Sequence, residues 1–314
     1  MKGAQKAGCA RENSPLSITP ARRKRQRGVV RSRRVVIPIG GDPVRWYAHR
    51  MKQTRRLGWL AAGLLCVAAA RSACASDLAW KFSSSLDYAS GDYGTGTRSS
   101  SLYIPFTLKR YWNDWNASLT VPFLSQSSNG QVTNVGGKPG RIGRGSVSTD
   151  ATTHSGLGDL LVRGGYDILK EDPQPFDLSL VGKVKFPTAD KDKGLGTGEF
   201  DGGFGLESGK LIAPGWTLLA DLYFTVIGSP PGLDLRNQAA ADIGVSRLLI
   251  KELTLTALLE GSNALVSGEP APFDLRGILD YRLNEQGGLF IGALAGLSDG
   301  SPDYGLSFGG SYRF

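Results

Sequence analysis

Hydrophobic and polar side chains alternate one by one through much of the chain after residue 76. In residues 303–314, Tyr304, Leu306, Phe308, Tyr312 and Phe314 share one face, and small, polar or charged residues form the other. Successive side chains of a β-strand point to opposite faces, so this pattern predicts strands with one apolar face. No segment after residue 76 shows the period of about 3.6 residues that is typical of an amphipathic helix. The pattern therefore predicts an all-β protein.

The connections between these segments alternate in length. Short links such as residues 112–113 and 251–252 alternate with longer links that are rich in Gly, Ser and Asp, including the long stretch 127–156. An even number of strands, with short turns at one end and long loops at the other, is typical of bacterial outer-membrane barrels. We predict twelve strands, at residues 78–90, 98–111, 114–126, 157–169, 176–187, 200–211, 214–226, 237–250, 253–266, 272–283, 287–298 and 303–314.

The expected fold is a closed, antiparallel, up-and-down transmembrane β-barrel. Hydrocarbon offers backbone groups no hydrogen-bond partners, so a sheet crosses a membrane only when it closes on itself. A soluble sandwich also gives alternating faces. The loop asymmetry, the even strand count, the export signal described below and the aromatic residues near the short turns favour the barrel. These aromatic residues are Trp80, Trp115, Trp216, Tyr281, Tyr312 and Phe314.

The last strand is predicted to close the barrel, with Phe314 at the periplasmic interface. C-terminal aromatic endings of this kind resemble the signal that the outer-membrane assembly machinery recognises. On this interpretation Phe308, Tyr312 and Phe314 form that signal. The other expected partners are outer-membrane lipids and lipopolysaccharide.

The N-terminal quarter differs sharply in charge from the rest. Residues 1–75 carry 17 Lys and Arg against 2 Asp and Glu, whereas residues 76–314 are net acidic, so nothing there suggests nucleic-acid binding. From Met51 a basic segment, an apolar stretch and the small-residue site Ala73-Cys74-Ala75 predict a signal peptide over residues 51–75. Residues 1–50 are interpreted as a disordered, over-extended gene start, and residues 76–314 as the barrel. All three cysteines, Cys9, Cys66 and Cys74, precede the predicted cleavage site.

The charged side chains on the polar faces of the strands are expected to point into the lumen. If the strands pair as expected, Lys185 lies between Asp159 and Asp201 at the outer mouth, in a ladder of exposed ion pairs whose net negative charge concentrates cations. A register shifted by two would instead leave three independent solvated charges. The predicted lining of the lumen and mouth comprises Asp159, Arg163, Lys183, Lys185, Asp201, Glu207, Asp274, Arg276 and Asp280.

Little in the mature chain suggests catalysis or a cofactor. The glycines of residues 194–200 lack the spacing and the following helix of a phosphate-binding loop. His154 and Ser155 are adjacent, so on a strand they point apart, and an outer-membrane lipid hydrolase is the least favoured alternative. Too few histidines and cysteines remain for a metal site built on them. We expect neither an enzyme, a metal nor a cofactor.

Two stretches resemble a known family. "SGLGDLLVRGGYDIL" at 155–169 and "KVKFPTADKDKGLGTGEFD" at 183–201 resemble proteins of the MetA pathway of phenol degradation, although the family pattern favours Gly where this chain has Ala189. The resemblance implies an outer-membrane barrel that passes small aromatic or other hydrophobic solutes. The alternative from another class is a closed structural or adhesion barrel that acts through the 127–156 loop.

Overall fold

The computed structural model describes residues 79–143, 151–172 and 174–314, which form strands, turns and loops. Within these ranges no helix is long and apolar enough to cross a membrane. The predictions for residues 1–50 and 51–75 lie outside the described residues. The strands are β1 (Trp80–Gly91), β2 (Ser99–Tyr111), β3 (Trp115–Ser128), β4 (Val132–Val135), β5 (Lys138–Arg141), β6 (Thr152–Leu157), β7 (Leu160–Leu169), β8 (Asp177–Phe186), β9 (Asp201–Ala213), β10 (Trp216–Val226), β11 (Gln238–Ile250), β12 (Leu253–Ser262), β13 (Phe273–Arg282), β14 (Gly287–Gly296) and β15 (Tyr304–Arg313).

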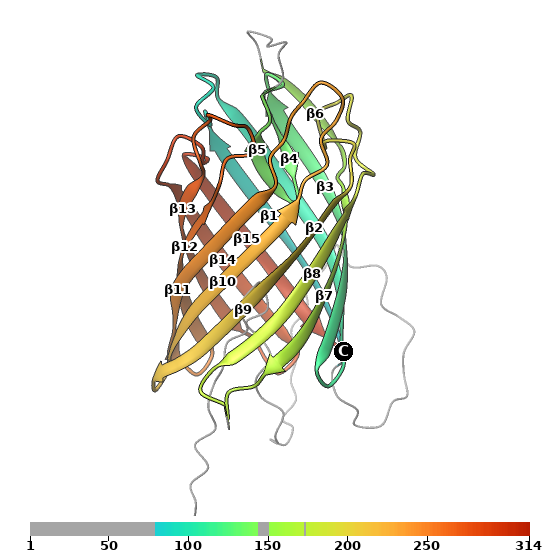
Figure 1. Ribbon diagram of the computed structural model, residues 1–314. Coiled ribbons are helices and arrows are strands. Elements are labelled where there is room, and N and C mark those ends of the chain that lie inside the picture. The colour runs from blue at the N-terminus through green and yellow to red at the C-terminus, as the bar shows by residue number, and fades with distance from the viewer. Residues whose placement is uncertain (1–78, 144–150, 173) are drawn as a thin grey trace, which may run out of the picture. The chain divides into compact units, whose positions relative to one another are not determined.

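One antiparallel sheet closes on itself to form the barrel wall (Figure 1). Most strands of the wall pair with their neighbours in the sequence, and β15 returns to pair with β1. Because β6 and β7 both pair with β3, one after the other, they form a single crossing, and the barrel has 12 strands. The predicted fold is therefore confirmed. The fourth crossing begins at Thr152 rather than at residue 157, because β6 extends the pairing with β3 beyond the predicted segment.

The seam between β1 and β15 extends to the last residue of the chain. Lys81 lies opposite Arg313, and Ser90 lies opposite Tyr304. The Phe314 amide donates to the Trp80 carbonyl (2.9 Å), and the Trp80 amide donates to the Phe314 carbonyl (3.0 Å). The C-terminal residue thus pairs as part of the wall, which removes the open edge that a sheet otherwise exposes.

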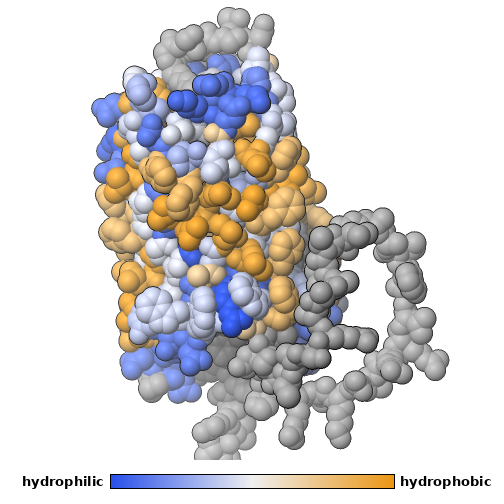
Figure 2. Space-filling view, turned by 90° about the vertical axis from the view of Figure 1, so that its right-hand side faces the viewer, coloured by the Kyte–Doolittle hydropathy of each residue, from blue (hydrophilic) through white to orange (hydrophobic). Residues whose placement is uncertain are grey.

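Large apolar side chains cover the outside of the barrel. Figure 2 shows them gathered across the middle of one face, with hydrophilic residues near both ends. Leu222, Ile243 and Phe308 are each more than half exposed. An apolar surface of this extent is expected to face lipid, because soluble monomers rarely expose patches larger than a few hundred Å².

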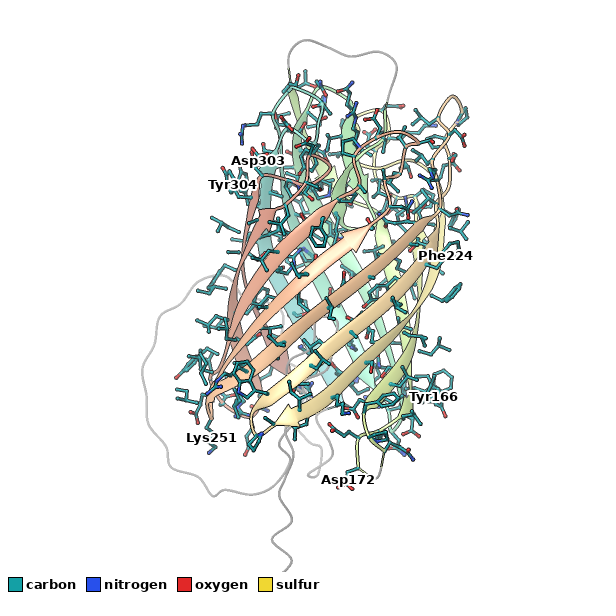
Figure 3. The ribbon with its side chains drawn as sticks, turned by 60° about the vertical axis from the view of Figure 1, so that its left-hand side comes forward. Tyr166, Asp172, Phe224, Lys251, Asp303 and Tyr304 are labelled. Atoms are coloured by element: carbon teal, nitrogen blue, oxygen red, sulfur yellow. The ribbon has the colours of Figure 1, made fainter. Side chains whose placement is uncertain are left out.

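The two ends of the barrel differ. Asp172 and Lys251 lie in turns at one end, whereas Asp303 lies in a loop at the other (Figure 3). The first end, here called the turn end, also holds one end of the seam, where Trp80 pairs with Phe314. Aromatic side chains face outward there, including Trp115, whose ring lies 4.5 Å from that of Tyr166. The other end is called the loop end below.

Candidate functional site

The long connection between β3 and β6 folds into the barrel instead of forming only an outer loop. It contains the hairpin β4–β5, a separate two-stranded sheet that the barrel wall encloses near the loop end (Figure 1). Its turn is the pair Gly136-Gly137, and both residues have positive φ, 64° and 93°. Two-residue hairpin turns need this conformation, which glycine adopts readily. The sequence carried this signal, a Gly-Gly pair between strand-forming residues, and it was missed.

Polar contacts hold the hairpin against β3 and three loops. The Gln126 amide donates to the Val132 carbonyl (2.5 Å), the Thr133 hydroxyl to the Gly194 carbonyl, and Arg141 to the Gly94 carbonyl (2.8 Å) and the Glu269 carboxylate (2.7 Å). An apolar cluster supports the side toward β11 and β12. Its buried members are Ile142, Ile227, Leu235 and Leu265. The hairpin is therefore anchored on both sides of the lumen and narrows it.

Five carboxylates form a row across the wall that faces the hairpin. Glu207 lies opposite Asp221, Asp221 opposite Asp242, Asp242 opposite Glu260, and Glu260 opposite Asp274. This acidic row spans the five successive strands β9 to β13. Directly opposed like charges are destabilising unless cations or hydrogen bonds compensate. Glu207 and Asp274 belong to the lining predicted from the sequence. The row appears only when the register of all five strands is known.

Cations and one hydroxyl compensate part of the acidic row. Arg276 contacts Glu260 with Nε (2.7 Å) and Nη2 (3.2 Å), and Lys138 from the hairpin approaches the same carboxylate (2.9 Å). Arg163 pairs with Glu207, which also accepts a hydrogen bond from the Tyr223 hydroxyl (2.6 Å). The row is thus held by groups from the wall and from the hairpin.

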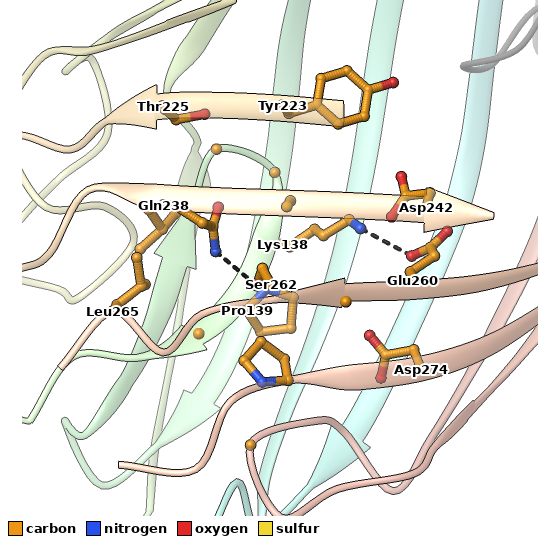
Figure 4. Close-up of a pocket in the computed structure, with 18 of the residues that line it drawn as sticks. Lys138, Pro139, Tyr223, Thr225, Gln238, Asp242, Glu260, Ser262, Leu265 and Asp274 are labelled. Atoms are coloured by element: carbon orange, nitrogen blue, oxygen red, sulfur yellow. Dashed lines mark hydrogen bonds and ion pairs between the residues drawn. The ribbon is translucent and has the colours of Figure 1, made fainter. Parts of the chain in front are cut away.

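A cavity of about 600 Å³ separates the hairpin from this wall (Figure 4). Lys138 reaches across it to Glu260, and Asp242 and Asp274 also line it. Arg163 and Lys183 line it from β7 and β8. Opposite charges on facing sides of a narrow passage create a field across it, as in channels whose selectivity is set by charged side chains. Apolar side chains of the lining include Tyr103, Val135, Pro139, Val181, Leu265, Val266, Pro270, Pro272, Leu294 and Pro302.

The predicted lining residues fall into three groups. Five of them surround the cavity: Arg163, Lys183, Glu207, Asp274 and Arg276. Asp280 lies on the same face of β13, toward the turn end. Asp159, Lys185 and Asp201 lie together but away from the cavity. The lining groups that the sequence did not suggest include Lys138 and Arg141 of the hairpin and Asp242 of β11.

Lys185 lies between Asp159 and Asp201, at 3.3 Å and 2.9 Å from their carboxylate oxygens. Its ammonium group also donates to the Thr197 hydroxyl (2.8 Å). Both ion pairs expected from the sequence are present, but they are not exposed, since the Lys185 side chain is only 2% exposed. The loop after β8 covers it, with Leu195 packed against Leu124. These three charges are therefore a buried ion group and not an open wall of the mouth.

Cations gather in the lumen at the turn end. Arg313, Lys81 and Lys109 lie opposite one another on β15, β1 and β2. Arg313 and Lys109 also lie over the ring of Tyr111, at 4.9 Å and 5.0 Å from its centre. A solute that crosses the barrel would therefore meet the cavity near one end and positive charge near the other.

Two loop residues at the loop end have shifted pKa values. The Tyr93 ring is fully buried, and burial raises the pKa of its hydroxyl, which Asp274 and Asp303 raise further. A hydrogen bond from Lys193 lowers the pKa of Asp190. His154 and Ser155 are successive residues of β6 and point apart, and the Ser155 hydroxyl bonds to Ser125 Oγ (2.7 Å).

A family match covers residues 87–314, which include nearly the whole barrel, and its description is "Putative MetA-pathway of phenol degradation". The chain belongs to this family. The family resemblance inferred from residues 155–169 and 183–201 is therefore confirmed. No curated protein matches the chain by sequence.

Solved structures of outer-membrane proteins align with this MetA-pathway family member, and the first of them shares its fold. The COG4313 outer membrane channel from Pseudomonas putida F1 aligns with a TM-score of 0.55 at 14% identity, over 75% of this chain and 95% of that one. The KdgM porin aligns with a TM-score of 0.45 at 10% identity, over 74% and 99%. The P. putida toluene transporter TodX aligns with a TM-score of 0.43 at 11% identity, over 76% and 91%.

Proposed function

We propose that this protein is a passive outer-membrane channel for small solutes that combine an apolar, aromatic body with a polar group. The cavity between the hairpin and the acidic row carries this proposal. Its apolar lining suits a ring, and its carboxylates, guanidinium groups and the Tyr223 hydroxyl offer partners for a polar substituent. The family description, which refers to phenol degradation, supports the same class of solute.

The proposed location is the bacterial outer membrane, with the turn end toward the periplasm. The closed barrel, its apolar outer surface and the aromatic residues at the turn end support this orientation. Export would follow cleavage after Ala75, and assembly would use the C-terminal strand with Phe308, Tyr312 and Phe314. We propose no catalytic role, and the lipids of the outer membrane are the expected surroundings.

The hairpin is the proposed selectivity element. Lys138 places a cation directly against the acidic row and is itself largely exposed at its side chain (67%). Replacing it with glutamate would reverse the charge on the side of the cavity that faces Glu260. Ion selectivity in narrow pores follows the sign of such charges.

Planar-bilayer recording of the purified protein tests the proposal. We expect discrete conductance steps, and we expect Lys138→Glu to move the reversal potential toward cation selectivity. Lys193→Glu, in the exposed loop after β8, is the matched control and should leave the reversal potential nearly unchanged. Addition of 4-hydroxybenzoate should produce current blocks in the wild-type channel. A folded protein that shows no conductance would refute the channel and favour the closed structural or adhesion barrel.

A further inference from the structure

The acidic row has fewer cations than carboxylates. Its ion pairs all end on two of the five, Glu207 and Glu260. Among the residues that the structure describes, no Lys or Arg lies within ion-pair distance of the other three, Asp221, Asp242 and Asp274. Like charges that lie side by side repel one another unless a cation or a hydrogen bond compensates them. The row therefore favours the approach of a further positive group.

Two of these three carboxylates have an enclosed oxygen without a hydrogen-bond partner. Asp221 is 5% exposed and Asp274 is 9% exposed. Oδ1 of each accepts no hydrogen bond from any described residue. Buried polar atoms nearly always have a partner, because leaving them unpaired away from water is costly. Asp274 also lines the cavity, so a molecule in the cavity can supply the partner that its carboxylate lacks.

Asp274 belongs to a set of three carboxylates that line the cavity together. Glu260 lies directly opposite it on β12, and Asp242 lies opposite Glu260 on β11. Figure 4 shows Asp242 and Asp274 on either side of Glu260. Asp221 lies beside Asp242 on β10 and adds to the negative potential. Asp242, Glu260 and Asp274 are called the carboxylate cluster below.

An ammonium group from the chain itself already contacts the carboxylate cluster. Lys138 Nζ lies 2.9 Å from a Glu260 oxygen (Figure 4). The Lys138 side chain is 67% exposed, and its flexible four-carbon stem allows the ammonium group to turn away into the cavity. Glu260 stays paired when Lys138 leaves, because Arg276 holds it through Nε and Nη2. Another ammonium group can therefore replace that of Lys138 without leaving Glu260 unpaired.

We propose that the carboxylate cluster binds the ammonium group of an arylalkylamine, which takes the place of the Lys138 ammonium group. The proposal rests on the proposed channel function and specifies the charge of the solute's polar group. An amino group on an alkyl arm is protonated at neutral pH, as that of a lysine side chain is. An ammonium group offers three N–H donors and no acceptor, which suits a site built from carboxylate oxygens.

Apolar side chains near the carboxylate cluster suit the ring of such a solute. Pro139 of the hairpin, Leu265 and Leu294 all line the cavity. Leu265 packs against the hairpin, since a Cβ built on Gly140 would lie 3.2 Å from its side chain. Leu294 lies on β14, directly opposite Arg276. A ring attached to the bound ammonium group would contact these side chains and leave water, which favours binding.

The cations of the lining explain why this part of the cavity favours a cation over an anion. Arg141, Arg163 and Arg276 each already pair with a glutamate. An anion near the carboxylate cluster would be repelled by Asp242 and Asp274, which have no cation of their own among the described residues. Lys183 lines the cavity from β8, outside the acidic row, and remains for an anionic substituent.

Three probes of similar shape test the recognition of charge. Phenethylamine, phenethyl alcohol and hydrocinnamate carry an ammonium, a hydroxyl and a carboxylate group on the same phenyl ring and two-carbon arm. Isothermal titration calorimetry of the folded barrel in detergent measures their dissociation constants without requiring conductance. We expect the amine to bind about tenfold more tightly than the alcohol, which corresponds to about 1.4 kcal/mol. Equal binding of amine and alcohol, or tighter binding of hydrocinnamate, would overturn the proposal.

Two variants should change the amine affinity in opposite directions. Asp274→Asn keeps the shape and removes a charge of the carboxylate cluster, so phenethylamine should bind about tenfold more weakly. Lys138→Gln removes the competing ammonium group, so phenethylamine should bind more tightly. Binding of phenethyl alcohol should change in neither variant. The controls are Asp280→Asn, on the same face of β13 toward the turn end, and Lys193→Gln, in the exposed loop after β8; both should leave amine binding unchanged. Wild-type amine affinity in Asp274→Asn, or no gain in Lys138→Gln, would contradict the proposal.

Planar-bilayer recording distinguishes failure of this site from failure of the channel. In the wild-type channel, phenethylamine should block the current at lower concentration than phenethyl alcohol does. Preferential binding of the amine without any conductance would refute the channel and leave the binding site. Conductance that the amine and the alcohol block equally would leave the channel and overturn the amine site. Absence of both conductance and amine binding in the folded protein would overturn both.

Discussion

Replacing Lys185 with methionine should strongly destabilise the barrel. Methionine keeps most of the volume and removes the charge between Asp159 and Asp201, whose side chains are 6% and 4% exposed. Removing one partner of a buried ion pair costs about 3–5 kcal/mol, because the remaining charge stays buried. Here the two carboxylates keep backbone donors, the Ala189 amide (3.0 Å) and the Gly228 amide (2.9 Å). We therefore expect a loss near the lower end, about 3 kcal/mol.

Neutralising all three charged side chains distinguishes the cost of an unpaired buried charge from the cost of lost packing. In the triple variant Lys185→Met, Asp159→Asn and Asp201→Asn, no carboxylate is left without its cation. Replacing an entire buried ion group with neutral residues is often neutral or stabilising. The triple variant should therefore regain most of the stability that the single variant loses.

Urea unfolding of the protein in lipid vesicles, followed by tryptophan fluorescence, measures these differences. Lys193→Met is the matched control, because Lys193 pairs with Asp190 in the same loop but is half exposed (53%). Exposed pairs contribute little, so the free energy of unfolding should hardly change. Wild-type stability in Lys185→Met would refute the reasoning. If the triple variant is as unstable as the single variant, lost packing and not the unpaired charge causes the loss in free energy of unfolding.

Four further outcomes are expected. Tyr93→Phe should be at least as stable as wild type at neutral pH, because the Tyr93 hydroxyl has no hydrogen-bond partner among the described residues. Burial raises the pKa of Tyr93, so above about pH 10 its hydroxyl ionises in the unfolded chain but not in the folded protein, and the free energy of unfolding falls as the pH rises. Tyr93→Phe lacks this hydroxyl and should therefore lose less stability above about pH 10 in the same urea assay. Lys138→Glu should lower the free energy of unfolding while it shifts the reversal potential, because it places a second carboxylate against Glu260, whose side chain is only 10% exposed. Deletion of Phe314 should reduce the yield of heat-modifiable barrel on gels far more than deletion of Ala151, because Phe314 completes the seam; equal yields would contradict this. Protein purified from outer membranes should begin at Ser76 by N-terminal sequencing, and retention of residues 1–50 would refute cleavage there.

The alternation of side chains was enough to predict the barrel and its orientation of faces. A strand has a period of two, so each residue's face follows from its neighbours in the chain, without any knowledge of the fold. This rule assigns Arg163, Glu207 and Arg276 to the inner face, and all three line the cavity. The same local rule placed Phe308 and Tyr312 outside, where both are about half exposed.

Register and loop folding, in contrast, depend on contacts between residues far apart in the chain. Lys185 faces inward on any register, but only the fold of the loop after β8 decides that it is buried and not solvated. Lys138 approaches Glu260, 122 positions along the chain, because two anchored ends hold the hairpin inside the lumen. Alternation assigns a face to each residue but says nothing about which loop covers that face. The cavity and the acidic row both arise from tertiary packing, which places segments that are far apart in the chain against one another.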